Sequence, residues 1–470
     1  MPEPVNPKKD RSVENSARRV KIPYRDMRGL INHLERNGQL LRIQKAVSPR
    51  YTHTLLAQAD KAVLFENVEG YEVPVVGGLV GSRKRLALGL GSDEKVMGRD
   101  FMEALERPIN PDVVPDGPVK EVVKVGAQVD LTEFPIPLQH RKDGGPYISA
   151  GIVICKDEEG RRNVGCYRLM YRTPNETGID LVSPSDMRFT YQRSLDRGKP
   201  LPIAVALGVG TPELLAAAYK APPGFDEFAV ASALYGEPIR LTKCSTVELE
   251  VPASAEIVLE GEISTDGWTI DEGRYGDFTG HQCSIRWNPV FKIKAITHRK
   301  NPIFQTIFMP WENDWLESPP MEAAGWRALR EASVKTTAVY ATPASSCYWH
   351  LFASIKKRPG EGKNALLALM SLHAVKLVIV TDDDVDITDP QAVERALAFR
   401  VQPDQDVIIV SGARGKHLDP TLRASQLPKG TLPTTSKMGI DATIPEGVDR
   451  SEYELLEYPF MDEVKLEDFL

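Results

Sequence analysis

Short runs rich in β-branched residues recur between Val119 and His298, and they restrict the fold more than any other feature of this chain. Turn-forming residues separate the runs, and one helical stretch, Pro212–Tyr219, interrupts them. Short strands at such regular spacing are typical of an antiparallel sheet or a barrel. We expect strands at Val119–Val125, Gly151–Cys155, Val164–Tyr171, Ile203–Leu207, Ile239–Thr242, Val247–Val251, Ile257–Ile263 and Val290–Thr297.

The residues before these strands have the pattern of a small α/β unit. Asp26 can cap a helix that runs to Asn37, where Gly38 provides a stop signal. Strand-like and helical stretches follow at Leu40–Val47, Ala62–Glu66, Val73–Leu79 and, for the helical pieces, Ser92–Arg107. Prolines concentrated between Pro108 and Pro118 mark a boundary. The sequence therefore predicts an N-terminal α/β segment over residues 1–115 and a β-rich domain over residues 116–310.

Helices and strands alternate in the last third of the chain, which we take as an α/β domain over residues 311–470. Ser318 can cap its first helix, which we expect to run to about Val334. Alternation of this kind indicates a parallel sheet. The tail beyond Gly412 is rich in turn residues, and we expect it to wrap another surface. The expected elements between these points are strands at Thr337–Thr342, Tyr348–Lys356, Leu377–Thr381 and Val407–Ser411, and helices at Asn364–His373 and Pro390–Phe399.

Composition excludes several classes of function. A net charge of −7 argues against nucleic acid as the main partner. The chain has 5 cysteines and no CxxC pair, which fits a reducing compartment rather than a disulfide frame or a zinc ribbon. We find no apolar signal segment and no apolar run long enough to span a membrane, so we expect a soluble, cytoplasmic protein. Phosphate-loop glycine patterns are absent, which argues against an NTPase or a classical NAD enzyme.

Two segments about a hundred residues apart carry the chemistry. Asn163–Arg168 places a guanidinium directly after a tyrosine, and Glu272–Asp277 holds two carboxylates on a turn with Gly273 and Gly276. We expect these glycines to adopt backbone conformations that other residues resist. If the fold joins the segments, they form a cationic clamp for a substrate carboxylate beside a proton-transferring acid. The same residues also suit a partly buried ion-pair network without catalytic function.

Four motifs in this chain resemble the UbiD family of decarboxylases. They are Val251–Gly261, Glu272–Asp277, Lys376–Val385 and Ser436–Thr443, and they occur in the family's order. The resemblance implies an enzyme that uses prenylated FMN. It also implies three parts: an N-terminal α/β segment, a central split β-barrel like that of flavin reductases, and a C-terminal α/β domain through which the protein forms homodimers or homohexamers.

The resemblance assigns catalytic roles to one arginine and two acids. Arg168 matches the arginine that contacts the substrate carboxylate and the flavin, a task that suits the forked guanidinium. Glu272 matches the carboxylate that holds that arginine, and Asp277 matches the acid/base residue that delivers a proton after CO2 leaves. Burial in a dry pocket favours the protonated form of a carboxylic acid, as such a role requires.

The resemblance also implies a divalent ion, with Mn²⁺ expected, held by Asn163 and Glu227 against the flavin phosphate; a K⁺ ion is a further candidate. Hard oxygen donors suit such ions. Many members place a histidine between the two ligands, but this chain has none between His140 and His281. Water or one of several side chains could take its place: Ser183, Ser185, Asp186 or Gln192.

Other candidate contacts are less specific. Cys166 and Tyr167 are expected to contact the cofactor together with Asn163, Arg168 and Glu227, and Lys437 matches a lysine that reaches it. The acidic residues Asp382, Asp383, Asp384 and Asp386 favour a solvated turn or helix cap over a metal site. Trp311 and Trp315 suit either a wall that stacks on a flat acid or packing in a core or subunit contact.

The sequence therefore predicts a reversible, non-oxidative decarboxylase of an aromatic, heteroaromatic or α,β-unsaturated acid, supplied with cofactor by a flavin prenyltransferase. One alternative is a plain-FMN split-barrel reductase or flavin-binding module, which gives no reason for Arg168, Glu272 and Asp277. The other is a non-catalytic family relative that acts as an assembly subunit, which would not need Asp277.

Overall fold

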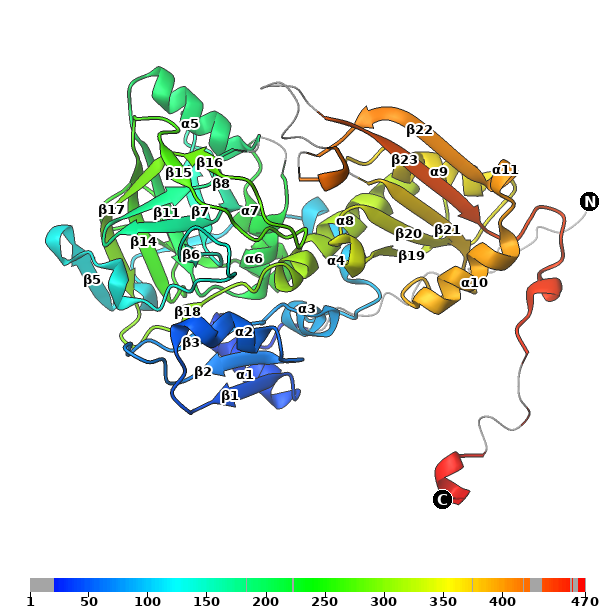
Figure 1. The fold of residues 1–470 in the computed structure, drawn as a ribbon, viewed down its shortest axis with the longest axis horizontal. Helices are drawn as coiled ribbons and strands as arrows, with labels where there is room; N and C mark the ends of the chain where they lie inside the picture. The colour runs from blue at the N-terminus through cyan, green and yellow to red at the C-terminus, as the bar shows by residue number, and fades with distance from the viewer. Residues whose placement is uncertain are drawn as a thin grey trace, which may run out of the picture. The chain divides into compact units, whose positions relative to one another are not determined.

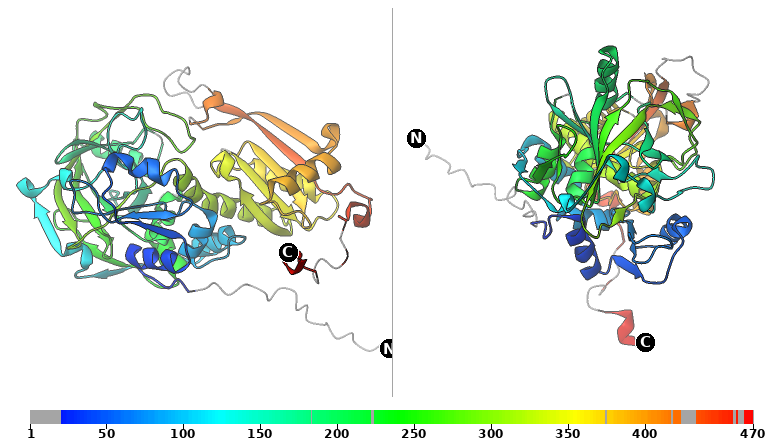
Figure 2. Two further views of the ribbon diagram at one scale, coloured as in Figure 1. Left: turned by 60° about the horizontal axis from the view of Figure 1, so that its bottom comes forward. Right: turned by 90° about the vertical axis from the view of Figure 1, so that its left-hand side faces the viewer.

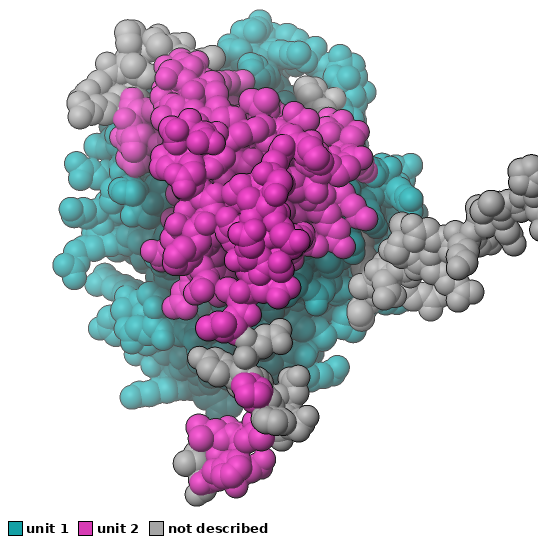
Figure 3. Space-filling view, turned by 90° about the vertical axis from the view of Figure 1, so that its right-hand side faces the viewer, with its two compact units in different colours: residues 1–320 teal, residues 321–470 magenta. Residues whose placement is uncertain are grey.

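The structure, a computed structural model, describes residues 21–182, 184–221, 224–373, 375–416, 418–422, 433–456, 459 and 464–469. The candidate ligand Ser183 lies outside these residues. The chain divides into two compact units, Met1–Pro320 and Met321–Leu470, which Figure 3 colours separately. Helix α8 (Trp311–Glu331) begins in the first and ends in the second.

An antiparallel sheet in the order β6-β9-β10-β17-β14-β11-β7-β8 dominates unit 1, and β5 also pairs with β17. Strand β8 ends this order and β9 is next to its other end, yet only Tyr167 and Arg168 separate the two strands in sequence. The sheet must therefore curl, and Figure 1 and the right view of Figure 2 show a half-barrel. The strands are β5 (Val122–Val125), β6 (Tyr147–Ile148), β7 (Ile152–Lys156), β8 (Arg162–Cys166), β9 (Leu169–Thr173), β10 (Glu176–Ile179), β11 (Leu201–Leu207), β14 (Ile257–Ile263) and β17 (Val290–His298).

The predicted antiparallel sheet is confirmed, but two of the predicted strands were wrong. The run Val164–Tyr171 is not one strand, because the chain leaves one end of the sheet after Cys166 and enters the other at Leu169. Val247–Leu249 is a bend rather than a strand, with the Leu249 N–H donating to Val247 O at 2.9 Å. Only β13 (Glu250–Pro252) remains there, in a small sheet with β12 (Arg240–Lys243) and β4 (Asp112–Val114).

A second sheet in unit 1, in the order β1-β2-β3-β18, carries the N-terminal part. Asp26 caps α1 as predicted, with its carboxylate accepting from the Gly29 N–H. The strand β18, however, comes from far along the sequence and pairs with β3 in parallel. The elements are α1 (Met27–Arg36), β1 (Leu40–Ile43), α2 (Thr52–Leu56), β2 (Ala62–Phe65), β3 (Val75–Gly77), α3 (Arg83–Leu90), α4 (Met97–Glu106) and β18 (Phe304–Gln305).

Three further helices and a hairpin complete unit 1. The predicted helix at Pro212–Tyr219 is α6 (Thr211–Ala218), while α5 (Asp186–Asp196) and α7 (Glu227–Tyr235) were not predicted. Every residue of α7 is buried, so its sequence has no polar face to reveal a helical period. Strands β15 (Ile270–Glu272) and β16 (Arg286–Asn288) form the hairpin that carries Glu272.

Unit 2 is built on a sheet in the order β19-β20-β21-β23-β22. The strands β20, β21 and β23 run parallel, as predicted, whereas β19 and β22 join antiparallel at the edges. Two predictions were wrong: α8 starts at Trp311 rather than after Ser318, and part of the tail returns as β23 in the middle of the sheet instead of wrapping a surface. The elements are β19 (Thr336–Ala341), β20 (His350–Ile355), α9 (Glu361–Met370), β21 (Leu377–Asp382), α10 (Pro390–Arg400), α11 (Pro403–Asp406), β22 (Val407–Arg414) and β23 (Thr434–Ala442).

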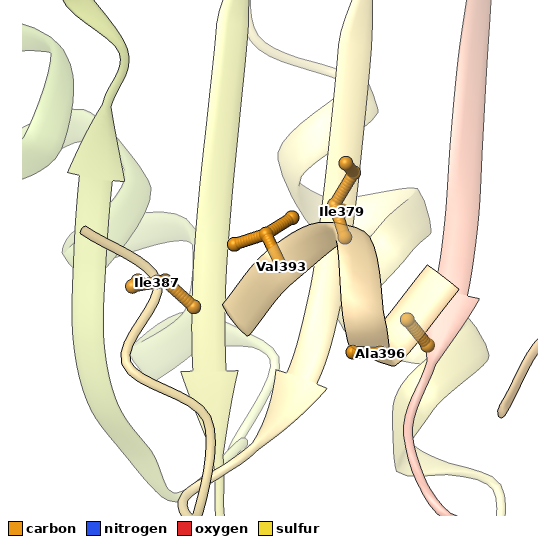
Figure 4. Close-up of a cluster of buried hydrophobic side chains, with 5 residues drawn as sticks. Ile379, Ile387, Val393 and Ala396 are labelled. Atoms are coloured by element: carbon orange, nitrogen blue, oxygen red, sulfur yellow. The ribbon is translucent and has the colours of Figure 1, made fainter. Parts of the chain in front are cut away.

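An apolar cluster joins α10 to this sheet. Figure 4 shows Val393 and Ala396 of α10 near Ile379 of β21, with Ile387 on the segment that leads into the helix. In the part of the chain that the structure describes, the acidic run before α10 belongs to no group of three or more His, Cys, Asp or Glu side chains that could hold a metal. Asp383 pairs with Arg450, Asp384 pairs with Arg400, and Asp386 accepts from the Thr388 N–H, which confirms the predicted turn.

Candidate active site

The fold brings the two predicted segments together at Arg168. This residue lies where the chain crosses between the two ends of the curled sheet, and Glu272 ends β15. Arg168 Nε and Nη2 donate to the two carboxylate oxygens of Glu272 at 2.7 and 2.8 Å. Glu272 is only 1% exposed. A bidentate pair in this setting fixes the plane of the guanidinium.

Two more carboxylates approach the same guanidinium. Asp180, which follows β10, lies 2.9 Å from Arg168 Nη1, and Asp277 lies 3.6 Å from it. Burial acts to lower the pKa of Arg168, but Asp180, Glu272 and Asp277 outweigh it and raise that pKa well above its usual value. Arg168 is therefore a permanent cation. Asp180 was not predicted; its position opposite Arg168 depends on the β9–β10 register, which sequence spacing does not reveal.

Asp277 sits on a short turn that also holds Cys283. The Asp277 N–H donates to His281 O at 2.9 Å, and the Cys283 N–H donates to Tyr275 O at 2.8 Å. The Cys283 thiol donates to Asp277 Oδ2 at 3.0 Å. Arg286 Nη2 lies 3.7 Å from the Cys283 sulfur, and its Nη1 lies 3.6 Å from Asp180. Cys283 and Arg286 were also missed, although both lie within ten residues of the predicted Asp277.

Aromatic and thioether side chains surround this charged group. The Arg168 guanidinium carbon lies 4.7 Å from the centre of the Tyr275 ring, a cation–π contact. The Tyr147 and Tyr275 rings are 4.5 Å apart, and Met170 and Met309 pack against them. The resulting low local polarity strengthens the electrostatic contacts of Arg168.

The turn that carries Asp277 is anchored by Asp143. Its carboxylate accepts from the Gly276 N–H at 2.9 Å and from the His140 N–H at 2.9 Å. Contact with Asp143 raises the pKa of His140 above its usual value.

The predicted reason for the glycines of this turn was wrong. Neither Gly273 nor Gly276 has a positive φ. They are needed for space, because a Cβ would lie 2.2 Å from the Gly144 Cα at Gly273 and 2.3 Å from the His140 ring at Gly276.

Cys166 and Tyr167 lead directly into Arg168. Cys166 is exposed to solvent, yet desolvation by surrounding protein raises the pKa of its thiol to about 12. Burial likewise raises the pKa of Tyr167. The cofactor contacts of Cys166 and Tyr167 stay predictions.

Asn163 and Glu227 also meet, as a shared metal site requires. Asn163 Nδ2 donates to Glu227 Oε1 at 3.3 Å, and within the described part of the chain Asn163 Oδ1 is buried without a hydrogen-bond partner. Burial raises the pKa of Glu227 to about 8. An unpaired amide oxygen beside a desolvated carboxyl group suits a hard divalent cation. Among the described residues, however, no group of three or more His, Cys, Asp or Glu side chains is placed to hold a metal.

The candidates for the missing histidine differ in position. Asp186 lies at the start of α5, close enough to Glu227 to act on it electrostatically. Ser185 caps the same helix and bonds to Tyr167. Gln192 points to Asp196 instead, with its amide donating at 2.9 Å on an exposed surface. Asp186 and Ser185 are thus better placed than Gln192.

Lys437 and the two predicted tryptophans lie in other settings. Lys437 belongs to unit 2, where its ammonium donates to Met370 O and Leu372 O at the end of α9 at 2.8 and 2.6 Å. Trp311 is 57% exposed in the first turn of α8, and Trp315 is half-buried on the same helix. Their proposed contacts with cofactor or substrate stay predictions.

Two cavities are distinct from this constellation by their linings. One, of about 440 Å³, includes Arg25, Glu213, Tyr235 and Arg299, and another, of about 400 Å³ in unit 2, includes His373, Arg414 and Lys437. Neither lining contains Arg168, Glu272 or Asp277. The candidate active site is therefore identified by its converging side chains rather than by cavity volume.

Three family models match the chain in succession. The N-terminal domain of 3-octaprenyl-4-hydroxybenzoate carboxy-lyase matches residues 31–105, its Rift-related domain matches residues 112–311, and its C-terminal domain matches residues 314–442. In the described part of the chain, no helix has the length and apolar character needed to cross a bilayer.

Several characterised proteins resemble the whole chain. An anhydromevalonate phosphate decarboxylase of Methanosarcina mazei is 36% identical, over 90% of this chain and 96% of the relative. The UbiD-class enzyme HmfF from Pelotomaculum thermopropionicum, in complex with FMN, is 38% identical with a TM-score of 0.89, over 95% and 100%. An evolved dimeric form of HmfF with prenylated FMN (prFMN) is 36% identical, with a TM-score of 0.86, and the match covers 95% of this chain and 100% of that one. The 3,4-dihydroxybenzoic acid decarboxylase of Klebsiella pneumoniae is 27% identical, with a TM-score of 0.84, and the match covers 95% of this chain and 99% of that one.

Proposed function

The chain belongs to the UbiD family of decarboxylases, and we propose that it removes CO2 reversibly from an aromatic, heteroaromatic or α,β-unsaturated carboxylic acid, with prenylated FMN as cofactor. The observation that carries the proposal is the Arg168–Glu272 pair with Asp277 beside it. The solved relative with prFMN, and relatives that act on an organic acid phosphate and on an aromatic acid, support the cofactor and the substrate class.

Arg168 is the proposed binding group for the substrate carboxylate. A guanidinium has five N–H donors. Within the described residues, hydrogen bonds to Glu272 and a contact with Asp180 engage three of them, on Nε, Nη2 and Nη1. The remaining two suffice for one bidentate carboxylate. Glu272 and Asp180 would hold the guanidinium still while the substrate binds.

Asp277 is the proposed proton donor. Its position 3.6 Å from Arg168 Nη1 lets it reach the carbon from which a carboxylate bound to Arg168 has departed. Asp277 is 6% exposed, so solvent access to the transferred proton is restricted. General acid–base help of this kind contributes roughly 10²–10⁴-fold.

Prenylated FMN, when bound, would supply the electrophile that accepts the electrons released as the carbon–carbon bond breaks. Cys166 and Tyr167 would line its site beside Arg168. Asn163 and Glu227 would hold a divalent ion, Mn²⁺ by preference, against its phosphate, with Asp186 or Ser185 completing the ligand set and K⁺ as a further candidate. Lys437 is a further proposed contact of the cofactor.

The curled sheet would serve as a flavin-reductase-like split barrel spanning residues 116–310, flanked by segments 1–115 and 311–470. The protein would form a homodimer or homohexamer, receive its cofactor from a flavin prenyltransferase, and work in the cytoplasm.

A proton-exchange assay tests the proposed function. Protein co-produced with a flavin prenyltransferase and supplied with Mn²⁺ is incubated in D2O with the decarboxylated products of an acid panel. We expect deuterium at the former carboxyl position of at least one product. Glu272→Gln should reduce exchange to background, because Arg168 loses its buried bidentate partner.

The matched control is Asp271→Asn, which changes an exposed carboxylate on the same strand and should leave exchange unchanged. Undiminished exchange in Glu272→Gln would remove the proposed role of the pair. Protein that carries unmodified FMN, oxidises NADPH and exchanges no product would favour the reductase alternative. Absence of both activities would favour an assembly subunit.

A further inference from the structure

A local backbone pairing fixes Cys283 next to Asp277. The segments 275–277 and 281–283 form a short antiparallel pair, with a bridge between Gly276 and Gln282. Side chains alternate between the two faces of such a pair. Asp277, Tyr275 and Cys283 therefore share one face, which the Tyr275–Arg168 contact places at the active site.

The hydrogen bonds around Cys283 run from Arg286 through the thiol to Asp277. Arg286 Nη2 approaches the sulfur as a donor at 3.7 Å, and the thiol donates onward to Asp277 Oδ2 at 3.0 Å. The other Asp277 oxygen accepts from the Phe278 N–H at 2.7 Å. Burial, and next the charge of Asp277, raise the pKa of Cys283 to about 12, so the group keeps its hydrogen at neutral pH.

We propose that Cys283 is a positioning residue for the reaction: its thiol donates a permanent hydrogen bond that orients the Asp277 carboxyl group and stabilises its ionised form. The proposal rests on the proposed function of Asp277. A hydrogen-bond donor to a carboxylate favours its charged state over its protonated state.

Other charged groups facing Asp277 must be considered together with the thiol. Arg168 directly precedes β9, and Asp180 directly follows β10. Glu272 ends β15, and Arg286 begins β16. His281, which pairs with Asp277, and Asp143 and Tyr275 also lie close by. None of these groups changes in a Cys283 variant, so a shift in pH dependence would report the thiol alone.

The test compares Cys283→Ala and Cys283→Ser as holoenzymes in the product-exchange assay across pH 5–10. In the alanine variant we expect the alkaline midpoint of the profile to move up by about half to one pH unit, since the carboxylate loses a donor. In the serine variant the hydroxyl restores the donor, and the midpoint should stay at or below that of the unmodified protein.

Cys244→Ala is the matched control, because Cys244 is another half-buried thiol of unit 1 with no hydrogen bond to Asp277. Identical midpoints in all four proteins would overturn the inference while leaving the proposed function standing. Lower rates in both Cys283 variants with an unmoved midpoint would reduce Cys283 to a packing role and also overturn it. Absence of exchange in the unmodified protein would instead defeat the proposed function.

Discussion

At the residue scale, the site is governed by excess negative charge around one guanidinium. Arg168 faces Glu272, Asp180 and Asp277, and Arg286 is the second cation nearby. A substrate carboxylate adds another negative charge. Protonation of one acid would relieve the resulting repulsion, which is consistent with Asp277 acting as a proton donor.

His140 provides a prediction about pH and stability. Its hydrogen bond to Asp143 raises the pKa of His140 in the folded state above the unfolded value. The contribution to stability is then fully present below the unfolded pKa of about 6.5 and is lost as pH rises through the folded pKa. We expect His140→Gln to lower the free energy of unfolding by about 1 kcal/mol at pH 5.5.

At pH 9 the same substitution should cost clearly less, because neutral histidine has lost the charged contact. Urea unfolding of both proteins at the two pH values measures the difference. A cost that is equal at both would show that the ring acts through packing against Gly276 and Tyr275 rather than through charge.

At the element scale, the hairpin β15–β16 is held against the segment around Gly144 by close backbone contact. The Gly144 N–H donates to Arg274 O at 2.8 Å, and the Gly144 and Gly273 backbones leave no room for a side chain between them. Because Gly273 directly follows Glu272 at the end of β15, we expect this contact to fix the position from which Glu272 reaches Arg168.

Adjacent glycines give a matched test of that contact. Gly144→Ala would place a Cβ 2.2 Å from the Gly273 Cα, whereas the Cβ of Gly145→Ala meets only the flexible end of Met170, at 2.9 Å. We expect Gly144→Ala to destabilise the fold by about 1–3 kcal/mol and to reduce exchange activity at least tenfold. Gly145→Ala should lose far less of both. Thermal unfolding and the exchange assay would be run on each protein, and equal losses would contradict the hairpin contact.

At the scale of the whole molecule, unit 2 exposes apolar side chains at one edge of its sheet. Ile409 on the edge strand β22 is 68% exposed, and Met438 on β23, which pairs with Ile409, is 37% exposed on the same face. An edge strand with exposed apolar residues is a ready surface for association. This supports the proposed self-association of the chain.

Ile409→Asp tests this surface. A charge on the strand should weaken association, so we expect a lower mass by sedimentation velocity at the same protein concentration. The control is Phe189→Asp, which alters an aromatic residue that is 57% exposed on α5 of unit 1 and should leave the mass unchanged. An unchanged mass in the β22 variant would exclude this surface as the contact.

The sequence by itself determined most of the strands and helices and three of the charged groups that meet at the site. Periodic β-branched runs and a capped first helix depend on local preferences, so the antiparallel sheet and α1 were predictable. The same holds for Arg168, Glu272 and Asp277, which lie in compact motifs. Helix α7 was not predicted because all of its residues are buried, so its sequence shows no alternation of polar and apolar residues at the helical period.

Only the tertiary structure decided how remote segments meet. Curling of the sheet places Arg168 at the crossing from β8 to β9, the β9–β10 register adds Asp180, and the turn after Asp277 adds Cys283. The insertion of β18 and β23 into their sheets is decided in the same way. Such pairings depend on contacts between residues far apart in the chain, whose energies no local pattern records.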